Sequence, residues 1–287
     1  MTTLKNVTVL GTGVLGSQIA YQTAYSGFIV SVYDISEVVI ESARARFAGL
    51  ATTYQREVTG ATVGKTDAAL SRISYFTDLG AAVANADIVI EAVPEVLTIK
   101  QDTYTKLGAL APAKTIFATN SSTMLPSAMK GFTGRPKQFL ALHFANQVWK
   151  FNTAEVMGTT DTDPAVFETV VEFAAEIGMV PIPIHKEKAG YVLNTLLVPL
   201  LNAAAGLAAG GIADPHDIDK VWRIATGAPL GPFQIYDVIG LTTPYNILSQ
   251  GGEADQKLAA WLKENYIDKG KLGVASGEGF YAYPKGH

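Results

Sequence analysis

The chain has 287 residues, of which 48% are hydrophobic and 17% charged, and it carries a formal net charge of -4. This composition excludes a disordered chain, and the length predicts about two domains. The charge is too small to predict a nucleic-acid partner, and no dense basic run predicts binding to an anionic membrane surface. Cysteine is absent, which excludes disulfide bonds and thiolate metal sites. We therefore expect a small-molecule partner and no metal centre.

The apolar segments are too short or too interrupted to predict a membrane span. Val7 to Leu10 leads straight into a glycine turn and is too short for the core of a signal peptide. Residues 191–209 are interrupted by Asn194, Pro199 and Asn202, whereas a spanning helix needs about 18 or more consecutive apolar residues. We therefore predict a cytoplasmic protein without a membrane partner.

Residues 1–186 alternate short β-rich runs with longer helical patterns, which predicts an α/β domain with a Rossmann-like, doubly wound parallel sheet. The runs are almost continuously apolar, as is typical of strands covered on both faces. The predicted strands are Val7–Leu10, Ile29–Tyr33, Ile88–Ile90, Thr115–Ala118, Phe139–Leu142, Ala154–Val156 and Val180–Ile184. Residues 36–77 have a helical composition, and we expect a helical hairpin there that stands off the sheet.

After the charged stretch His185–Lys188 the pattern changes to long helices, so we expect residues 187–287 to form an all-α domain. This domain opens with the almost wholly apolar segment Tyr191–Leu201, which as a helix has to be buried. Its cover is either the core of its own domain or a second subunit. The sequence supports both equally.

A glycine-rich turn lies between the first strand and an amphipathic helical run. In this context the first glycine permits the tight turn, the second lets a pyrophosphate approach the backbone, and the third lets helix and strand pack closely. The turn consists of Gly11, Thr12, Gly13, Val14, Leu15 and Gly16. The pattern predicts a dinucleotide site; the alternative is a turn that merely links strand and helix.

Asp34 stands at the end of the second strand, 23 residues after Gly11, where a carboxylate binds the ribose hydroxyls of the adenosine. Capping of the next helix is the alternative. Asp34 would repel a 2′-phosphate, and the following Ile35, Ser36 and Glu37 offer no arginine to receive one. We therefore predict NAD as the cofactor, with NADH preferred over NADPH.

Reduction of a carbonyl group by such a cofactor requires a proton donor, and histidine has the most suitable pKa. His143 ends the strand Phe139–Leu142 and so lies at a carboxyl strand end, where doubly wound sheets bind ligands. His185, His216 and His287 lie in the linker, at a polar helix start and at the last position. A buried structural histidine is the alternative for His143.

Glu155 follows His143 by twelve residues, in a strand-like run that could form a hairpin with the first strand. A carboxylate there would fix the imidazole tautomer and stabilise its protonated form; an exposed edge glutamate is the alternative. Residues Asn120–Thr123 directly follow a strand, and their polar groups either cap the next helix or hold a carbonyl oxygen.

The segment from Glu91 to Glu95 follows another strand, at the switch region of the sheet. We expect Ala92 and Glu95 to border the nicotinamide ribose. Capping of the following helix by Glu95 is equally compatible with the sequence.

Taken together, these motifs resemble the 3-hydroxyacyl-CoA dehydrogenase family over essentially the whole chain. The matching segments occur in the family's order, which makes the resemblance specific. They are residues 11–16, 91–95, 119–122, 142–146, 190–199, 217–219, 231–233 and 277–281.

The resemblance implies that His143 is the general acid/base and Glu155 its partner. It also implies that Ser122 and Asn194 bind the substrate oxygen and help to place the histidine, with Asn194 reaching in from the second domain. Finally, it implies a homodimer formed by the helical domain and a set of residues that border the nicotinamide end: Glu95, Lys100 and Asn146.

The sequence departs from the family after His143. Members usually continue with two prolines and a lysine, whereas residues 146–154 here read NQVWKFNTA. The change puts the usual acyl-CoA substrate in doubt, because Trp149, Phe151 and Trp222 could line an apolar pocket for a bulkier ester or ketone. They could equally be core aromatics. Residues 273–277 also lack the basic residues usual before the terminal glycine motif.

These departures resemble the diketoreductase branch of the family, which implies NADH-dependent reduction of β-keto or β,δ-diketo esters. An ordinary (S)-3-hydroxyacyl-CoA dehydrogenase of fatty-acid metabolism is the first alternative. A gulonate-type 3-dehydrogenase would want a cationic cluster near the substrate carboxylate, and none is evident in the sequence. A catalytically silent, crystallin-like protein would have no chemical reason to keep His143, Glu155, Ser122 and Asn194.

Overall fold

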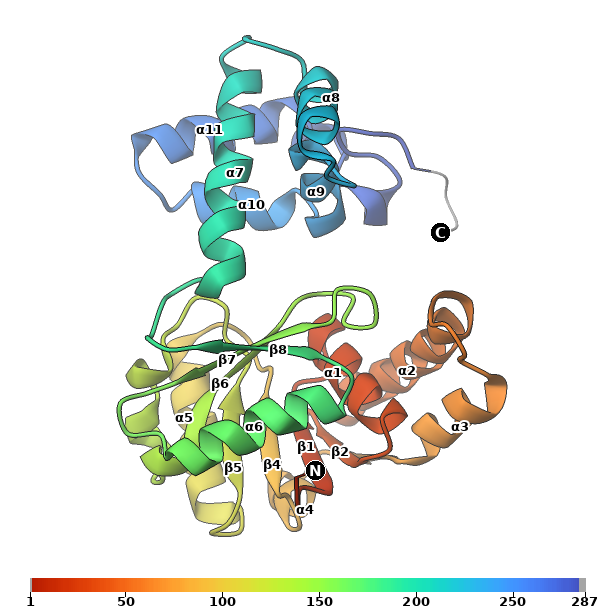
Figure 1. Cartoon of the computed structure of the whole chain (residues 1–287), viewed down its shortest axis with the longest axis vertical. Helices are drawn as coiled ribbons and strands as arrows, with labels where there is room; N and C mark the ends of the chain where they lie inside the picture. The colour runs from red at the N-terminus through yellow and green to blue at the C-terminus, as the bar shows by residue number, and fades with distance from the viewer. Residues whose placement is uncertain (1, 284–287) are drawn as a thin grey trace. The chain divides into compact units, whose positions relative to one another are not determined.

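The computed structural model describes residues 2–283, and the chain divides after Val192 into two compact units (Figure 1). The sequence predicts this boundary near residue 186. The later division reflects bonds that hold the intervening residues to the first unit: Ser127 N donates to Glu187 at 2.7 Å, and Val192 N donates to Glu155 at 2.8 Å.

The first unit is built on an eight-stranded sheet with the strand order β3-β2-β1-β4-β5-β6-β7-β8. All neighbouring strands run parallel except β6 and β7, which form an antiparallel pair. The order reverses between β1 and β4, the switch point at which such sheets bind ligands. The strands are β1 Asn6–Leu10, β2 Ile29–Tyr33, β3 Ile73–Phe76, β4 Ile88–Glu91, β5 Ile116–Thr119, β6 Phe139–Phe144, β7 Thr153–Gly158 and β8 Val180–Ile184.

Helices cover both faces of this sheet, which explains the apolar character of its central strands. Val7 and Val9 of β1 belong to a core shared with α1, α2, α3 and α6, whereas Leu10 belongs to a core shared with α4 and α5. The helices are α1 Val14–Tyr25, α2 Glu37–Glu57, α3 Val63–Ser71, α4 Leu79–Val83, α5 Leu97–Leu110 and α6 Pro164–Glu176, and three 3-10 turns span Pro126–Ala128, Lys130–Phe132 and Pro136–Gln138. The predicted fold class is confirmed.

The segment between β2 and β4 differs from the prediction in two ways. It contains a strand, β3, which pairs with β2 at the edge of the sheet. Its two long helices also do not stand off the sheet, because Phe47 and Tyr54 of α2 are fully buried in the core that contains α1. The hydroxyl of Tyr54 donates to Gln22 of α1 at 2.5 Å, so the hairpin is part of the first unit's core.

The second unit is helical, with a core around Phe233, Tyr236 and Phe280. Two buried carboxylates connect its parts. Asp219 accepts hydrogen bonds from two backbone amides at the start of α9 and from the hydroxyl of Tyr281, and Asp237 accepts those of the Phe280 and Tyr281 amides. The helices are α7 Tyr191–Ala209, α8 Pro215–Thr226, α9 Pro232–Ile239, α10 Thr242–Leu248 and α11 Glu253–Asn265, with 3-10 turns at Ile267–Lys269 and Val274–Ser276.

Helix α7 is buried along one side only. Leu201 and Ala205 lie in the core of the second unit, whereas Leu196 and Leu207 are 69% and 44% exposed. Within residues 2–283, α7 is also the one helix whose length and composition would suit a membrane span. That property is weak evidence, since core helices of soluble proteins share it.

Candidate active site

The glycine turn between β1 and α1 has the shape that a dinucleotide needs. Gly11 has φ +87°, and a β-carbon on it would lie 2.5 Å from the carbonyl oxygen of Ala92. A β-carbon on Gly16 would lie 2.0 Å from the carbonyl oxygen of Gly11, whereas one on Gly13 would have nothing within 4 Å. Gly11 and Gly16 are therefore required by packing, and Gly13 faces open space.

The start of α1 suits an anion. Gly13 is its N-cap, without a capping side chain, and the first turn contains no acidic residue. Val14 is 67% exposed and Leu15 half-buried, so the first turn lies at the surface. The N-terminal amides and the helix dipole favour a phosphate at this position, so these residues fit the pyrophosphate of NAD.

Asp34 connects the end of β2 to the glycine turn. Its Oδ2 accepts hydrogen bonds from the backbone amide and the hydroxyl of Thr12, both at 2.7 Å. Asp34 does not cap α2, because Ser36 is the N-cap of that helix. The structure also places Arg46 beside the turn, where its guanidinium donates to the Thr12 carbonyl at 3.0 Å; the sequence did not indicate this arginine.

His143 and Glu155 form a buried pair on neighbouring strands. They are directly opposed in the antiparallel register of β6 and β7, and each side chain is 5% exposed. His143 Nδ1 lies 3.0 Å from Glu155 Oε2. An ionised carboxylate can only accept, so Nδ1 carries the proton in this pair and the neutral ring keeps Nε2 free to accept. The alternative of an exposed edge glutamate is wrong because Glu155 is buried, whereas burial and hydrogen bonding of His143 suit a catalytic and a structural histidine alike.

Ser122 completes the contacts of the imidazole. Its Oγ lies 3.0 Å from His143 Nε2, so the neutral ring accepts the hydroxyl proton there. The ring of Tyr191 stacks on His143 with a centroid distance of 4.2 Å and an interplanar angle of 11°. The Tyr191 hydroxyl donates to the Ser121 carbonyl at 2.8 Å, so Tyr191 holds both the imidazole plane and the serine segment.

Glu95 gathers the hydroxyl segment around one carboxylate oxygen. Its Oε1 accepts from the Ser121 hydroxyl at 2.5 Å, from the Ser122 amide at 3.1 Å and from the Thr123 amide at 3.0 Å. Burial raises the pKa of Glu95, but these hydrogen bonds and the charge of Lys100 outweigh it and hold the pKa at about 2. The helix-capping alternatives for Glu95 and for the hydroxyl segment are wrong. Helix α5 has no side-chain cap, and neither does the 3-10 turn Pro126–Ala128, which is the next helical element after the hydroxyl segment.

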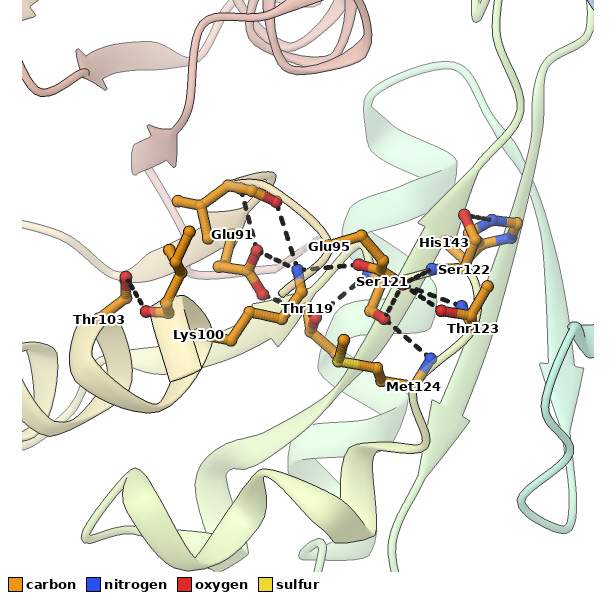
Figure 2. A network of polar contacts seen from close by, with 12 residues as sticks. Glu91, Glu95, Lys100, Thr103, Thr119, Ser121, Ser122, Thr123, Met124 and His143 are labelled. Carbon is orange, nitrogen blue, oxygen red and sulfur yellow. Dashed lines mark hydrogen bonds and ion pairs between the residues drawn. The ribbon is translucent and has the colours of Figure 1, made fainter. Parts of the chain in front are cut away.

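Lys100 lies behind Glu95 and is only 1% exposed. Its ammonium is 2.6 Å from Glu91 Oε1 and 3.2 Å from Glu95 Oε2. Figure 2 shows these contacts as one connected series from Glu91 to His143. The structure therefore places Glu95 and Lys100 within the network that supports Ser122.

The remaining predicted cofactor residues lie at the carboxyl ends of the strands. Ala92 follows β4 and packs against the glycine turn, where its carbonyl oxygen leaves no room for a side chain on Gly11. Asn146 lies just beyond β6 and is exposed. Within residues 2–283, no group of three or more His, Cys, Asp or Glu side chains is placed to hold a metal ion.

The three predicted pocket aromatics are divided between the two units. Trp149 packs against Tyr54 of α2 with a centroid distance of 5.7 Å, and its indole N–H donates to Glu57 at 2.8 Å. Phe151 is 40% exposed. Trp222 lies on α8, in the second unit, as does the predicted site residue Asn194 on α7. Trp149 thus fastens the β6–β7 connection to the helical hairpin.

Two of the three other histidines lie within the described residues. His185 is exposed in the linker. His216 stacks on Tyr281 and lies 2.9 Å from the Phe280 carbonyl in the second unit. His287 lies outside the described residues.

Two contributors to the site were not singled out from the sequence. Tyr191 was read only as the first residue of an apolar helix, although its place after Gly190 and its φ of +53° mark it as the end of a turn. Glu91 is expected from the sequence only as the first residue of the segment that follows a strand, whereas it is the last residue of β4. A glutamate inside an otherwise apolar strand, nine residues before a lysine, was the available signal.

Comparison with known proteins identifies the family. Residues 6–188 match the NAD binding domain of 3-hydroxyacyl-CoA dehydrogenase, and residues 190–283 match its C-terminal domain. The chain is 34% identical to the mitochondrial hydroxyacyl-coenzyme A dehydrogenase of Rattus norvegicus, over 98% of this chain and 91% of that protein.

Solved structures agree over nearly the whole chain. A diketoreductase, studied for the catalysis of dicarbonyl compounds, is 66% identical with a TM-score of 0.95 and covers 99% of this chain and 100% of its own. The (S)-3-hydroxybutyryl-CoA dehydrogenase PaaH1 of Ralstonia eutropha is 28% identical with a TM-score of 0.82 and covers 99% and 100%. The protein therefore belongs to the 3-hydroxyacyl-CoA dehydrogenase family and is an NAD-dependent oxidoreductase acting on a CH–OH or C=O group.

Proposed function

We propose that this protein reduces 3-keto esters, including β,δ-diketo esters, to hydroxy esters, with His143 as the proton donor. The observation that carries the proposal is the 66% identity to a diketoreductase over 99% of the chain. The geometry around His143 supplies the chemistry.

When bound, the reduced nicotinamide supplies the hydride to the carbonyl carbon. His143 in its protonated form gives the proton from Nε2 to the oxygen, and Glu155 stabilises the imidazolium through Nδ1 at 3.0 Å. Ser122, 3.0 Å from Nε2, is placed to share the same oxygen as a donor. Asn194 is proposed, on the family resemblance, to add a second donor. Oxidation of the alcohol uses the same groups in reverse.

The β6–β7 connection contains the residues that depart from the family pattern after His143, and we propose that it selects a keto ester over an acyl-CoA. An open pocket of about 420 Å³ is lined by Glu57, Trp149 and Lys150. Hydrogen bonds from Arg56 and the Trp149 indole lower the pKa of Glu57, so a carboxylate stands at this pocket. Arg56 pairs with Glu57 at 2.6 Å and Lys150 lines the same pocket, so the pocket carries charges of both signs. We propose that the aromatic side chains of Trp149, Phe151 and Trp222 contact the ester or the bulkier end of the ketone.

NADH is the proposed reductant because of Asp34. The carboxylate, at the end of β2, repels a 2′-phosphate. Arg46, the nearby cation, is engaged with the Thr12 carbonyl at 3.0 Å. We propose Asn146 as a further neighbour of the nicotinamide.

A homodimer through the second unit is proposed from its exposed apolar side chains. Leu196 of α7 is 69% exposed, and Val221 and Ile224 of α8 are 68% and 75% exposed. Such side chains are typical of an interface. Light scattering on the purified protein measures the mass; a monomer at micromolar concentration would refute this part of the proposal.

The substrate is tested by following NADH oxidation with a 3,5-diketo ester and with acetoacetyl-CoA at matched concentrations. We expect the larger kcat/KM for the ester. A strong preference for the thioester would instead indicate an ordinary 3-hydroxyacyl-CoA dehydrogenase. If neither compound is turned over, the proposal is refuted, and a sugar-acid dehydrogenase or a catalytically silent NADH-binding protein becomes the favoured alternative.

The proton donor is tested with His143→Ala, and exposed His185→Ala provides the matched control. Loss of the positioned proton donor costs about 10² to 10⁴-fold in turnover. Near-normal activity of a folded His143→Ala protein would refute the assignment of His143.

A further inference from the structure

A buried ion pair is connected, through Glu95 and Ser122, to the proposed proton donor His143. Glu91 is fully buried at the end of β4, and Lys100 on α5 is 1% exposed. Glu91 Oε1 accepts from the Lys100 ammonium at 2.6 Å, and Oε2 accepts from the Tyr104 hydroxyl at 3.1 Å and the Thr119 hydroxyl at 2.8 Å. Burying two charges is costly, and an apolar pair of the same volume would usually stabilise a protein as well or better. The pair is therefore weak evidence for a purely stabilising role.

Two separate routes lead from Glu91 to the serine segment (Figure 2). The first passes through Lys100 to Glu95, which accepts the Ser122 amide at 3.1 Å. The second passes through Thr119, whose hydroxyl accepts the Ser121 amide at 3.1 Å. Both routes end on the two residues that determine where the Ser122 hydroxyl meets His143.

The hydrogen-bonding capacity of Lys100 is used within this network. Its ammonium donates hydrogen bonds to Glu91 Oε1 at 2.6 Å and to the Val93 carbonyl at 3.4 Å, and it forms an ion pair with Glu95 Oε2 at 3.2 Å. Because Lys100 is only 1% exposed, direct recognition of the cofactor by this side chain would require it to leave these contacts.

We propose that Glu91 and Lys100 are positioning residues that act through Glu95 and Thr119 to hold the Ser122 hydroxyl against His143. The proposal rests on the proposed function of Ser122 and His143. It assigns Lys100 to the alignment of the reacting groups, and it assigns Glu91 a part in the reaction without contact to the substrate.

The test is the double variant Glu91→Gln/Lys100→Met, which removes both buried charges; Glu95 loses the ammonium as a partner but keeps its hydrogen bonds from the serine segment. The matched control is Lys106→Met on the same helix, whose lysine is 59% exposed and pairs with Asp102. We expect kcat to fall by about 10 to 10²-fold, as for a small misplacement of a reacting group. The dissociation constant for NADH, measured by fluorescence titration, is expected to stay close to that of the wild type. The control should match the wild type in both.

A mutant cycle with Ser122→Ala separates positioning from general destabilisation. If the pair acts through Ser122, the double variant lowers kcat no further once Ser122 is alanine. Losses that multiply would overturn the proposal. A weakened NADH affinity with kcat preserved would also overturn it, since Lys100 would then act on the cofactor.

The proposal also has a readout that does not require turnover. In the double variant and in Ser122→Ala alike, the ¹⁵N signal of His143 Nε2 should shift in the same direction, because the same hydrogen bond is lost; an unshifted signal in the double variant would refute positioning. This holds whichever carbonyl compound the enzyme reduces, so failure of the substrate proposal is distinguishable. If the double variant does not fold, Tyr104→Phe removes one donor to Glu91 and keeps the ion pair, and the same cycle and spectra apply with a smaller effect.

Discussion

The second glycine of the turn offers a way to separate cofactor binding from folding. Gly13 has φ -62° and ψ -168°, a conformation open to any residue, and a β-carbon on it would meet nothing within 4 Å. Gly→Ala at a compatible position stabilises by about 0.4 to 1 kcal/mol through the unfolded chain. Alanine is, however, a poorer N-cap than glycine by a comparable amount. We therefore expect Gly13→Ala to leave the free energy of unfolding nearly unchanged.

The same methyl group would occupy the space through which the pyrophosphate approaches the backbone. We expect the NADH dissociation constant of Gly13→Ala to rise about tenfold or more, equivalent to about 1.4 kcal/mol of binding free energy. Gly16→Ala provides the contrast, because its β-carbon would lie 2.0 Å from the Gly11 carbonyl oxygen. That clash involves backbone and cannot relax by rotation of a side chain, so we expect Gly16→Ala to lose about 3 kcal/mol of stability or more.

Thermal unfolding with and without NADH measures both effects. At a ligand concentration of about 100 times the wild-type dissociation constant, binding stabilises the wild type by about 2.7 kcal/mol. A tenfold weaker variant at the same concentration gains only about 1.4 kcal/mol. Gly13→Ala should therefore match the wild type without NADH and show about half of its stabilisation with NADH. A full NADH response of Gly13→Ala, or an unchanged melting temperature of Gly16→Ala, would refute this reasoning.

Three further predictions concern the residues around the proposed proton donor. Glu155→Gln removes the charge beside His143 Nδ1, so kcat should fall by about 10² or more while NADH affinity is kept; steady-state kinetics with NADH titration checks both, and an unchanged kcat would contradict the role of Glu155. The pKa of Glu95 is lowered from 4.5 to about 2 in the folded protein, so its contribution to stability is present above pH 4.5 and is lost as the pH falls towards 2. Acid unfolding of Glu95→Gln should be flatter in that window, and an identical acid profile would count against the lowered pKa. Trp149→Phe keeps a ring but removes the hydrogen bond to Glu57 that holds the β6–β7 connection to α2. Because this connection is proposed to select the substrate, the preference for keto ester over acetoacetyl-CoA should fall several-fold; an unchanged ratio of kcat/KM values would show that this contact does not set the preference.

The features that could be predicted from the sequence are those that depend on residues close together in the chain. The glycine turn, Asp34 and the apolar strands follow from local spacing, and the opposition of His143 and Glu155 follows from two adjacent strand-like runs joined by a short connection. β3 was missed because, as an edge strand of four residues, it has one buried side chain, Ile73, and shows little periodicity. The predicted position of the helical insert was wrong because Phe47 and Tyr54 have the spacing of buried residues in any amphipathic helix. Only the fold shows which part of the protein covers them.

The rest of the site depends on contacts between distant parts of the chain. Tyr191 reaches the Ser121 carbonyl across 70 positions, and Trp149 reaches Glu57 across 92. No local pattern encodes such distances. The partner of Trp149 could not be predicted for the same reason, because its indole N–H requires a hydrogen-bond acceptor and finds one on α2.

The environment of His143 is set by three parts of the fold that differ in sequence and in chemistry. β7 supplies the charge through Glu155, the segment after β5 supplies the hydroxyl through Ser122, and the start of α7 supplies the stacking ring through Tyr191. Because Glu155 also accepts the Val192 amide at 2.8 Å, the imidazole, its carboxylate and the first turn of α7 are bonded to one another. The helix that continues into the second unit therefore begins on the groups proposed to move the proton. Tyr191 has a left-handed backbone conformation, with φ +53°. A non-glycine residue adopts this conformation at a cost of about 1 to 3 kcal/mol, so the contacts around His143 have to offset this local strain.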